Sequence, residues 1–271
     1  MTVQVGVRPS AALSAFERGA VSVSTGRLVA AAVLSAVMAA ASSRPWGLGA
    51  LALVAFIPAF SAIARAQTAL AGAGLAAIAS FGVASVAYEA TVAIGVHIYV
   101  LALLLAPLPY AVAGAVAVRF GRAVQHFANR RQHGAGTRHG RWTGRIALVV
   151  ALPVLWCAAE WLPAQPGLWG VYAMPLGAIG YSQADLPTLH LAGLSSVTAV
   201  SAVVLACNAL LILTVWRMQL PVLRLVAVTA LAGLALLVVV VWQRGSGPGG
   251  SDGALIQLVQ PNLPDSSYLA A

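Results

Sequence analysis

Two carboxylates lie at the ends of strongly apolar segments, where an ionised group is costly and normally has a partner or a function. Glu160 ends the apolar run 146–162 and precedes Trp161, while Glu89 follows the apolar run 67–88. Two interpretations of Glu160 stay open: an interfacial carboxylate held by Trp161 and loop amides, or a group that shapes an entrance for a lipid headgroup. For Glu89 we expect ordinary placement at the membrane interface.

The segment 163–190 connects two apolar runs and is rich in proline, with only moderate polarity. Such a segment commonly lies in the membrane interface or dips back into the membrane. Its aromatic side chains suit an interfacial position. We predict that Pro175, Tyr181 and Gln183 help to line a substrate portal, together with Glu160 and Trp161. For Tyr181 and Gln183 the alternative is a hydrogen-bonded loop without contact to substrate.

The other reactive side chains form no catalytic or metal-binding pattern. Cys157 and Cys207 lie inside apolar runs without a zinc or CxxC spacing, which favours small core residues. His126, His133 and His139 share one basic segment, but they lack helical i, i+4 spacing and a neighbouring carboxylate or cysteine. A solvated basic loop facing anionic lipid is therefore favoured over a metal site. We predict no catalytic residue, no cofactor and no metal in this chain.

Composition places these residues in a membrane protein. The 271 residues are 61% hydrophobic and only 8% charged, whereas soluble domains average about 45–50% apolar and about 25% charged residues. So few charges cannot cover a water-soluble globule. The composition excludes a soluble enzyme and predicts an all-α polytopic membrane bundle.

Apolar runs predict about seven transmembrane helices. They cover residues 28–41, 46–64, 67–88, 91–118, 146–162, 191–216 and 223–242. The first run is short: it either begins near Val21, with Arg27 reaching the interface, or forms half of a tight hairpin with the second. The fourth contains Pro107 and Pro109, which predict a kink rather than a break. The resulting domains are an N-terminal segment 1–27 and a helical domain 28–242, with loops at 119–145 and 163–190.

Arginine placement predicts the orientation. The chain has 15 basic residues, all of them arginine, against 6 acidic residues. With the N-terminus in the cytoplasm, the seven-helix arrangement leaves only Arg44 and Arg244 outside, as the positive-inside rule requires. We read the basic balance as contact with an anionic membrane face, with no nucleic-acid partner. We expect a multi-pass protein of the inner (plasma) membrane with an extracytoplasmic C-terminus.

The C-terminal residues change character. Residues 243–253 form a glycine-rich linker, and 254–260 read ALIQLVQ, which is typical of a buried strand. One strand cannot form a domain. We expect 254–271 to be the truncated start of an extracytoplasmic α/β domain.

Several stretches resemble the apolipoprotein N-acyltransferases, which are inner-membrane enzymes with a helical bundle and an inserted periplasmic nitrilase-like domain. RPWGL at 44–48 is similar to the start of the family's second span. WCAAEW at 156–161, MPL at 174–176 and GYSQ at 180–183 resemble its W-x-x-x-E-W…F-P-W…G-Y-S-Q loop. LVQPNLP at 258–264 resembles the L-V-Q-x-N-I-P that opens the nitrilase half.

The resemblance implies a function for the bundle. The family transfers an acyl chain from a phospholipid to the N-terminal amine of a diacylated lipoprotein cysteine, using a Glu-Lys-Cys triad. The resemblance covers nearly the whole chain but only the N-terminal half of the family protein. Because this chain contains no lysine, the triad cannot be complete in it, and the chain is catalytically incomplete. The implied partners are phospholipid, diacylated lipoprotein and a separately encoded nitrilase-like half. A fragment or a degenerate gene product fits equally well.

Two departures from the family pattern weaken the match at the loop. The arginine that usually follows the E-W pair is replaced around Pro163, and the tryptophan of F-P-W is Leu176. The alternative function is a non-enzymatic membrane scaffold or a small-solute transporter. Against transport, no predicted helix carries a charge at mid-membrane, and inverted repeats are not evident.

Overall fold

A computed structural model describes residues 24–43, 48–131, 137–165, 178–184 and 196–215, with single positions at 167, 186, 188, 191, 192, 228 and 230. This part of the chain is helical throughout and contains no strand. The linker 243–253 and the strand expected at 254–260 lie outside it. So do the N-terminal residues 1–23 and nearly all of the seventh predicted helix.

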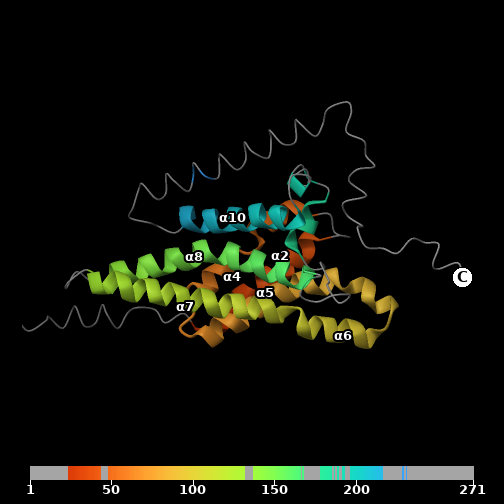
Figure 1. Ribbon diagram of the computed structural model, residues 1–271, viewed down its shortest axis with the longest axis horizontal. Helices are drawn as coiled ribbons and strands as arrows, with labels where there is room; N and C mark the ends of the chain where they lie inside the picture. Colours follow the sequence, from red (N-terminus) through yellow and green to blue (C-terminus); the bar gives the residue numbers. More distant parts are fainter. Residues whose placement is uncertain are drawn as a thin grey trace, which may run out of the picture.

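Five helical stretches in the described residues are long and apolar enough to cross a membrane. The chain is therefore a multi-pass membrane protein. The stretches are α2 (Thr25–Ser42), α5 (Ala69–Ala87), α6 (Val96–Leu105) continued by α7 (Pro107–Arg131), α8 (Thr137–Trp161) and α10 (Val197–Val215). In Figure 1 these helices run roughly side by side along the longest axis. The N-terminal helix α2 has Arg27 in its first turn and reaches 18 residues, enough to qualify as a span.

The second predicted helix is short and broken, which corrects the expectation of one continuous helix over 46–64. It consists of η1 (Gly49–Leu51), α3 (Ala52–Ala55) and α4 (Ile57–Ile63), and it is too short to count among the five. Pro58 has no N–H to donate, so the hydrogen-bond ladder is interrupted near the start of α4. Even so, α3 and α4 pack against α2 and α10 inside the bundle.

The prolines of the fourth predicted helix do not break the chain's helical path, in agreement with the expectation that they would not end the helix. α6 ends at Leu105 and α7 begins at Pro107, while Ala106 between them keeps helical backbone angles, φ −56° and ψ −35°. The chain thus continues as one apolar stretch over Val96–Arg130. The Tyr99 hydroxyl donates to the Ser85 carbonyl oxygen at 2.9 Å and ties α6 to α5.

The segment 119–145 was expected to be a loop, and this prediction is wrong. α7 continues to Arg131 and α8 begins at Thr137, so most of the basic segment forms a helical hairpin. Hydropathy falls at Arg119, but arginine, alanine and glutamine are good helix formers, so the helix continues beyond the apolar stretch. The helices cross at Gly121 and Gly144: a methyl group at Gly121 would lie 2.8 Å from the Gly144 carbonyl oxygen.

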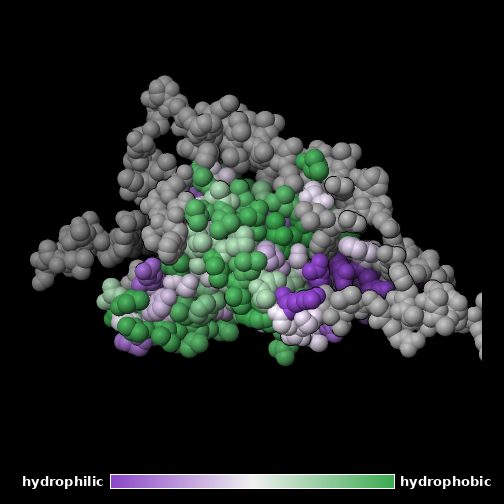
Figure 2. Space-filling view, turned by 180° about the vertical axis from the view of Figure 1, so that it is seen from behind, coloured by the Kyte–Doolittle hydropathy of each residue, from purple (hydrophilic) through white to green (hydrophobic). Residues whose placement is uncertain are grey.

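The centre of the bundle is an aromatic cluster around Trp156 of α8. Its ring lies 4.9 Å from Phe56, 5.7 Å from Phe60 and 4.7 Å from Tyr110, measured between ring centroids. The outer surface is apolar as well, and α6 contributes no buried residue. Figure 2 shows this hydrophobic surface over the middle of the molecule, with a larger group of hydrophilic residues at one end and a smaller group at the opposite end. That distribution suits helices surrounded by lipid.

Candidate functional site

Glu160 joins three elements at one end of the bundle. It is buried in the last turn of α8, and its Oε1 accepts a hydrogen bond from the Ile179 N–H at 3.0 Å. Ile179 opens the short 3-10 helix η5 (Ile179–Gln183). The next amide, Gly180 N–H, donates at 2.9 Å to the hydroxyl of Ser201 in α10. Glu160 and Ser201 therefore fix two successive loop amides to two helices.

The carboxylate of Glu160 is not fully satisfied by the residues that the structure describes. The Ser201 hydroxyl lies beside the carboxylate. No hydrogen bond of good geometry reaches the second oxygen, Oε2, from the described part of the chain, although this atom is buried. A buried carboxylate oxygen normally accepts a hydrogen bond. Oε2 is therefore the acceptor that this node offers to a further donor.

Gln183 fastens the other end of η5. Its side chain is fully buried, and its Nε2 donates to the Gly49 carbonyl oxygen and to the Ser182 hydroxyl, both at 2.8 Å. Its Oε1 accepts from the Thr188 hydroxyl at 2.9 Å. The amide is thus used by protein groups and connects the loop to η1. This geometry places Gln183 beneath the surface of the loop.

Trp161 and Tyr181 face outward beside this node. Trp161 is 48% exposed and Tyr181 is 37% exposed. Burial raises the pKa of the Tyr181 phenol, and the nearby Glu160 carboxylate raises it further. Tyr181 therefore lies near the buried Glu160 carboxylate, and Trp161 is its neighbour in the chain. Pro175, the fifth candidate, lies outside the described residues.

Sequence reasoning missed two polar side chains of α10: Ser201, which accepts the Gly180 N–H, and Asn208, which holds the broken second helix. Asn208 of α10 donates from Nδ2 to the Ala52 carbonyl oxygen and accepts at Oδ1 from the Phe56 N–H, both at 2.8 Å. In an unbroken helix Phe56 N–H would bond Ala52 directly; the carboxamide of Asn208 bridges that gap instead. The signal was available, because Asn208 and Ser201 are seven residues apart in an apolar run, which puts them on one helix face.

The remaining candidates stay apart. Cys157 in α8 and Cys207 in α10 are free thiols, both half-buried. Among the described residues no three His, Cys, Asp or Glu side chains gather where they could hold a metal ion. Glu89 is exposed at the start of η2 (Glu89–Ala93). His133 lies outside the described residues.

Comparison with known proteins supports the resemblance. The family model of the apolipoprotein N-acyltransferase N-terminal domain matches residues 35–210, more than half of the chain. No curated protein matches the sequence. The matched region contains α8 with Glu160, the whole of η5, and Asn208 in α10. The chain therefore belongs to the apolipoprotein N-acyltransferase family, through the N-terminal membrane domain of that family.

Proposed function

We propose that this bundle binds and positions the two lipid substrates of lipoprotein N-acylation, a phospholipid and a diacylated lipoprotein, without transferring the acyl chain itself. Family membership supports lipid and lipoprotein substrates in general. The observation that carries the finer proposal is the fixation of η5 to the bundle by Glu160 and Gln183. A loop held this firmly can present its outward side chains to a substrate in one geometry.

The exposed rings of Trp161 and Tyr181 form the proposed portal surface. Aromatic side chains of this kind favour the membrane–water interface, where one edge is apolar and the other is wet. Glu160 and Gln183 act below them as positioning residues, and Pro175 belongs to the same loop. Oε2 of Glu160 is the acceptor best placed for a substrate amine or hydroxyl that enters beside Tyr181.

Catalysis is assigned to a nitrilase-like half that is not in this sequence. The family's Glu-Lys-Cys triad needs a cationic lysine next to the thiolate and the developing oxyanion. These 271 residues contain no lysine, and both cysteines are in the helical bundle. The triad would come from the nitrilase-like half.

Binding of a lipopeptide tests the proposal. We expect a diacylated lipopeptide with a photoreactive headgroup to cross-link to the purified chain in lipid nanodiscs, near Trp161 and Tyr181. The double variant Trp161→Ala/Tyr181→Ala should reduce cross-linking at least fivefold. Phe127→Ala is the control, because it removes an exposed aromatic side chain from the far part of α7. Equal cross-linking in all three proteins would contradict the portal.

The same preparation tests catalytic silence. We expect no acyl-thioester with labelled phospholipid and no acylation of the lipopeptide, since the chain has no lysine for the oxyanion. Cys157→Ala and Cys207→Ala should therefore change nothing. A hydroxylamine-sensitive acyl adduct on either cysteine would show that the bundle has an active site of its own.

Arginine placement supports a cytoplasmic N-terminus, with the segment 119–145 on the same side. Arg65, Arg141 and Arg145 lie together near the start of α2, so these arginines do gather at one end of the described bundle. Reporter fusions at Gly134 and Gly250 should report opposite sides of the membrane. The same side for both fusions would rule out the seven-helix topology.

A further inference from the structure

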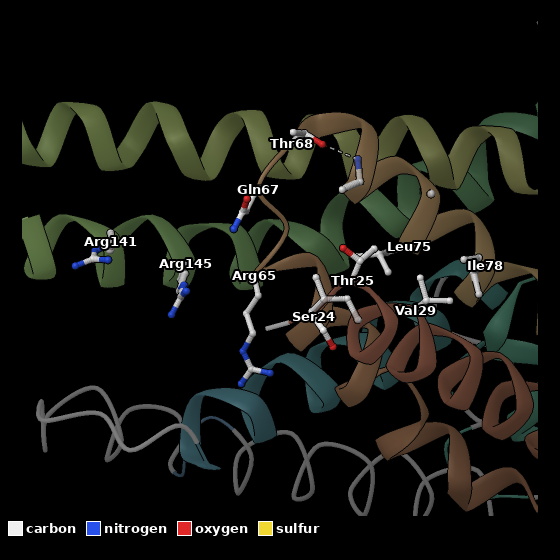
Figure 3. A pocket seen from close by; sticks show the side chains of 13 residues that line it. Ser24, Thr25, Val29, Arg65, Gln67, Thr68, Leu75, Ile78, Arg141 and Arg145 are labelled. Carbon is white, nitrogen blue, oxygen red and sulfur yellow. Dashed lines mark hydrogen bonds between the residues drawn. The ribbon is translucent and has the colours of Figure 1, made fainter. Parts of the chain in front are cut away.

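A pocket of about 920 Å³ lies between the start of α2, the turn from α4 to α5 and the first half of α8. Figure 3 shows Arg65, Arg141 and Arg145 along one side of it and apolar side chains, among them Val29 and Ile78, along the other. Glu160 is fifteen residues beyond Arg145 on α8, roughly 22 Å at 1.5 Å per residue. The pocket is therefore at the other end of the bundle from the proposed portal.

Arg65 and Arg145 of this pocket have no carboxylate near them among the described residues. The only acidic residues among the described ones are Glu89 and Glu160. Glu89 lies just after the C-terminus of α5, and Glu160 lies in the last turn of α8. The N-terminal parts of those two helices are the ones that line the pocket. A smaller adjoining cavity of about 190 Å³ shares all three arginines and adds Arg122. Clustered guanidinium groups favour an anionic ligand, and their planar donors suit phosphate.

The apolar side of the pocket indicates a lipid rather than a soluble anion. Ile78 also lines a second, almost wholly apolar groove of about 590 Å³, formed by α2, α5 and the junction of α6 with α7 and called the α2–α5 groove below. Val29 borders the arginine pocket, and Val33 and Val37 continue along the groove at four-residue spacing, 37%, 46% and 60% exposed. Four-residue spacing keeps these side chains on one helix face. A basic pocket thus leads directly into an apolar groove.

We propose that the arginine pocket binds the phosphate group of an anionic phospholipid, whose acyl chain lies in the α2–α5 groove. Several clustered cations favour a net negative headgroup over a zwitterionic one, because a headgroup amine would be repelled. The site is separate from the portal, so its lipid is a resident ligand and not the acyl donor. Its occupancy does not depend on the proposed acyltransferase function.

Native mass spectrometry of the full chain in detergent tests this site. Bound lipid is counted while the protein is titrated with phosphatidylglycerol or with phosphatidylcholine. We expect phosphatidylglycerol to bind at least tenfold more tightly. The variant Arg65→Gln/Arg145→Gln should lose at least tenfold in affinity for phosphatidylglycerol, and Arg65→Lys/Arg145→Lys should recover part of it. Arg119→Gln/Arg130→Gln removes the same charge outside the pocket and should change the affinity less than twofold.

Two further arms distinguish the source of the phosphate. Val33→Ser alters the groove alone and should weaken phosphatidylglycerol binding while the arginines are intact. Inorganic phosphate should neither displace the lipid nor stabilise the protein against heat. Equal affinity for the two lipids in the unmodified chain would overturn the proposal, whether or not any variant folds. Equal losses in the pocket and control variants would overturn it, as would arginine-dependent stabilisation by inorganic phosphate without lipid binding.

Discussion

Asn208→Ala should lower the free energy of unfolding of the bundle by about 2–4 kcal/mol, because it leaves two buried backbone groups without partners. These groups are the Ala52 carbonyl and the Phe56 N–H, which the Asn208 carboxamide now joins. The two could pair directly only if α3 and α4 straightened into one helix. That movement would displace Phe56 from its contact with Trp156, whose ring centroid lies 4.9 Å away. The two backbone groups therefore cannot regain a hydrogen bond without losing this packing.

Thermal unfolding in detergent measures this effect, and α10 supplies a matched control. The Thr214 hydroxyl donates to the Leu211 carbonyl oxygen at 2.8 Å within the same helix. Thr214→Ala removes a polar group without opening a contact between segments, so its cost should stay below about 1 kcal/mol. Equal stability of the alanine variants at 208 and 214 would contradict the role given to Asn208.

The helices themselves were largely predictable from the sequence. The run 67–88 became α5 at Ala69–Ala87, within two residues at each end, because a helix across a membrane must be apolar over its whole length. At the prolines 107 and 109, α6 passes into α7 through Ala106 without a break in the apolar stretch. The basic segment was misjudged because hydropathy reports where a helix leaves the lipid, whereas helix propensity decides where it ends.

The broken second helix could not have been predicted from local sequence. Pro58 signalled an interruption, but the groups that stabilise it come from far away in the chain. Asn208 is more than 150 residues from Ala52, and Ser35 of α2 accepts the Ala59 N–H at 2.9 Å. Local patterns carry no information on such pairings, which arise when the helices pack. Glu160 was the exception, since loop amides were among its expected partners and Ile179 N–H is one.

Glu160→Ala should release η5 from α8 and increase amide hydrogen exchange at Ile179 by roughly ten- to a hundredfold. The reason is the loss of a hydrogen bond to a charged acceptor, worth about 1.5–3 kcal/mol, and each 1.4 kcal/mol corresponds to about tenfold in an equilibrium constant. Gly180 should be less affected, because its N–H is held separately by Ser201. Hydrogen exchange followed by mass spectrometry over 178–184 measures the change.

Three companion variants separate the hydrogen bond from the charge. Glu160→Gln keeps an acceptor for the Ile179 N–H, so amide exchange at Ile179 should stay within a few-fold of that in the unmodified chain. An increase as large as in Glu160→Ala would mean that the negative charge, and not only the acceptor, holds the loop. Glu89→Ala removes the other described carboxylate, which is exposed, and should leave 178–184 unchanged. Ser201→Ala with Glu160→Ala should release both amides and lower lipopeptide cross-linking at Tyr181, because the ring is then no longer held in one place. Unchanged amide exchange at Ile179 in Glu160→Ala would contradict this role. It would mean that Gln183 and the packing of η5 on α10 hold the loop without the carboxylate. Glu160 would then not be a positioning residue of the portal.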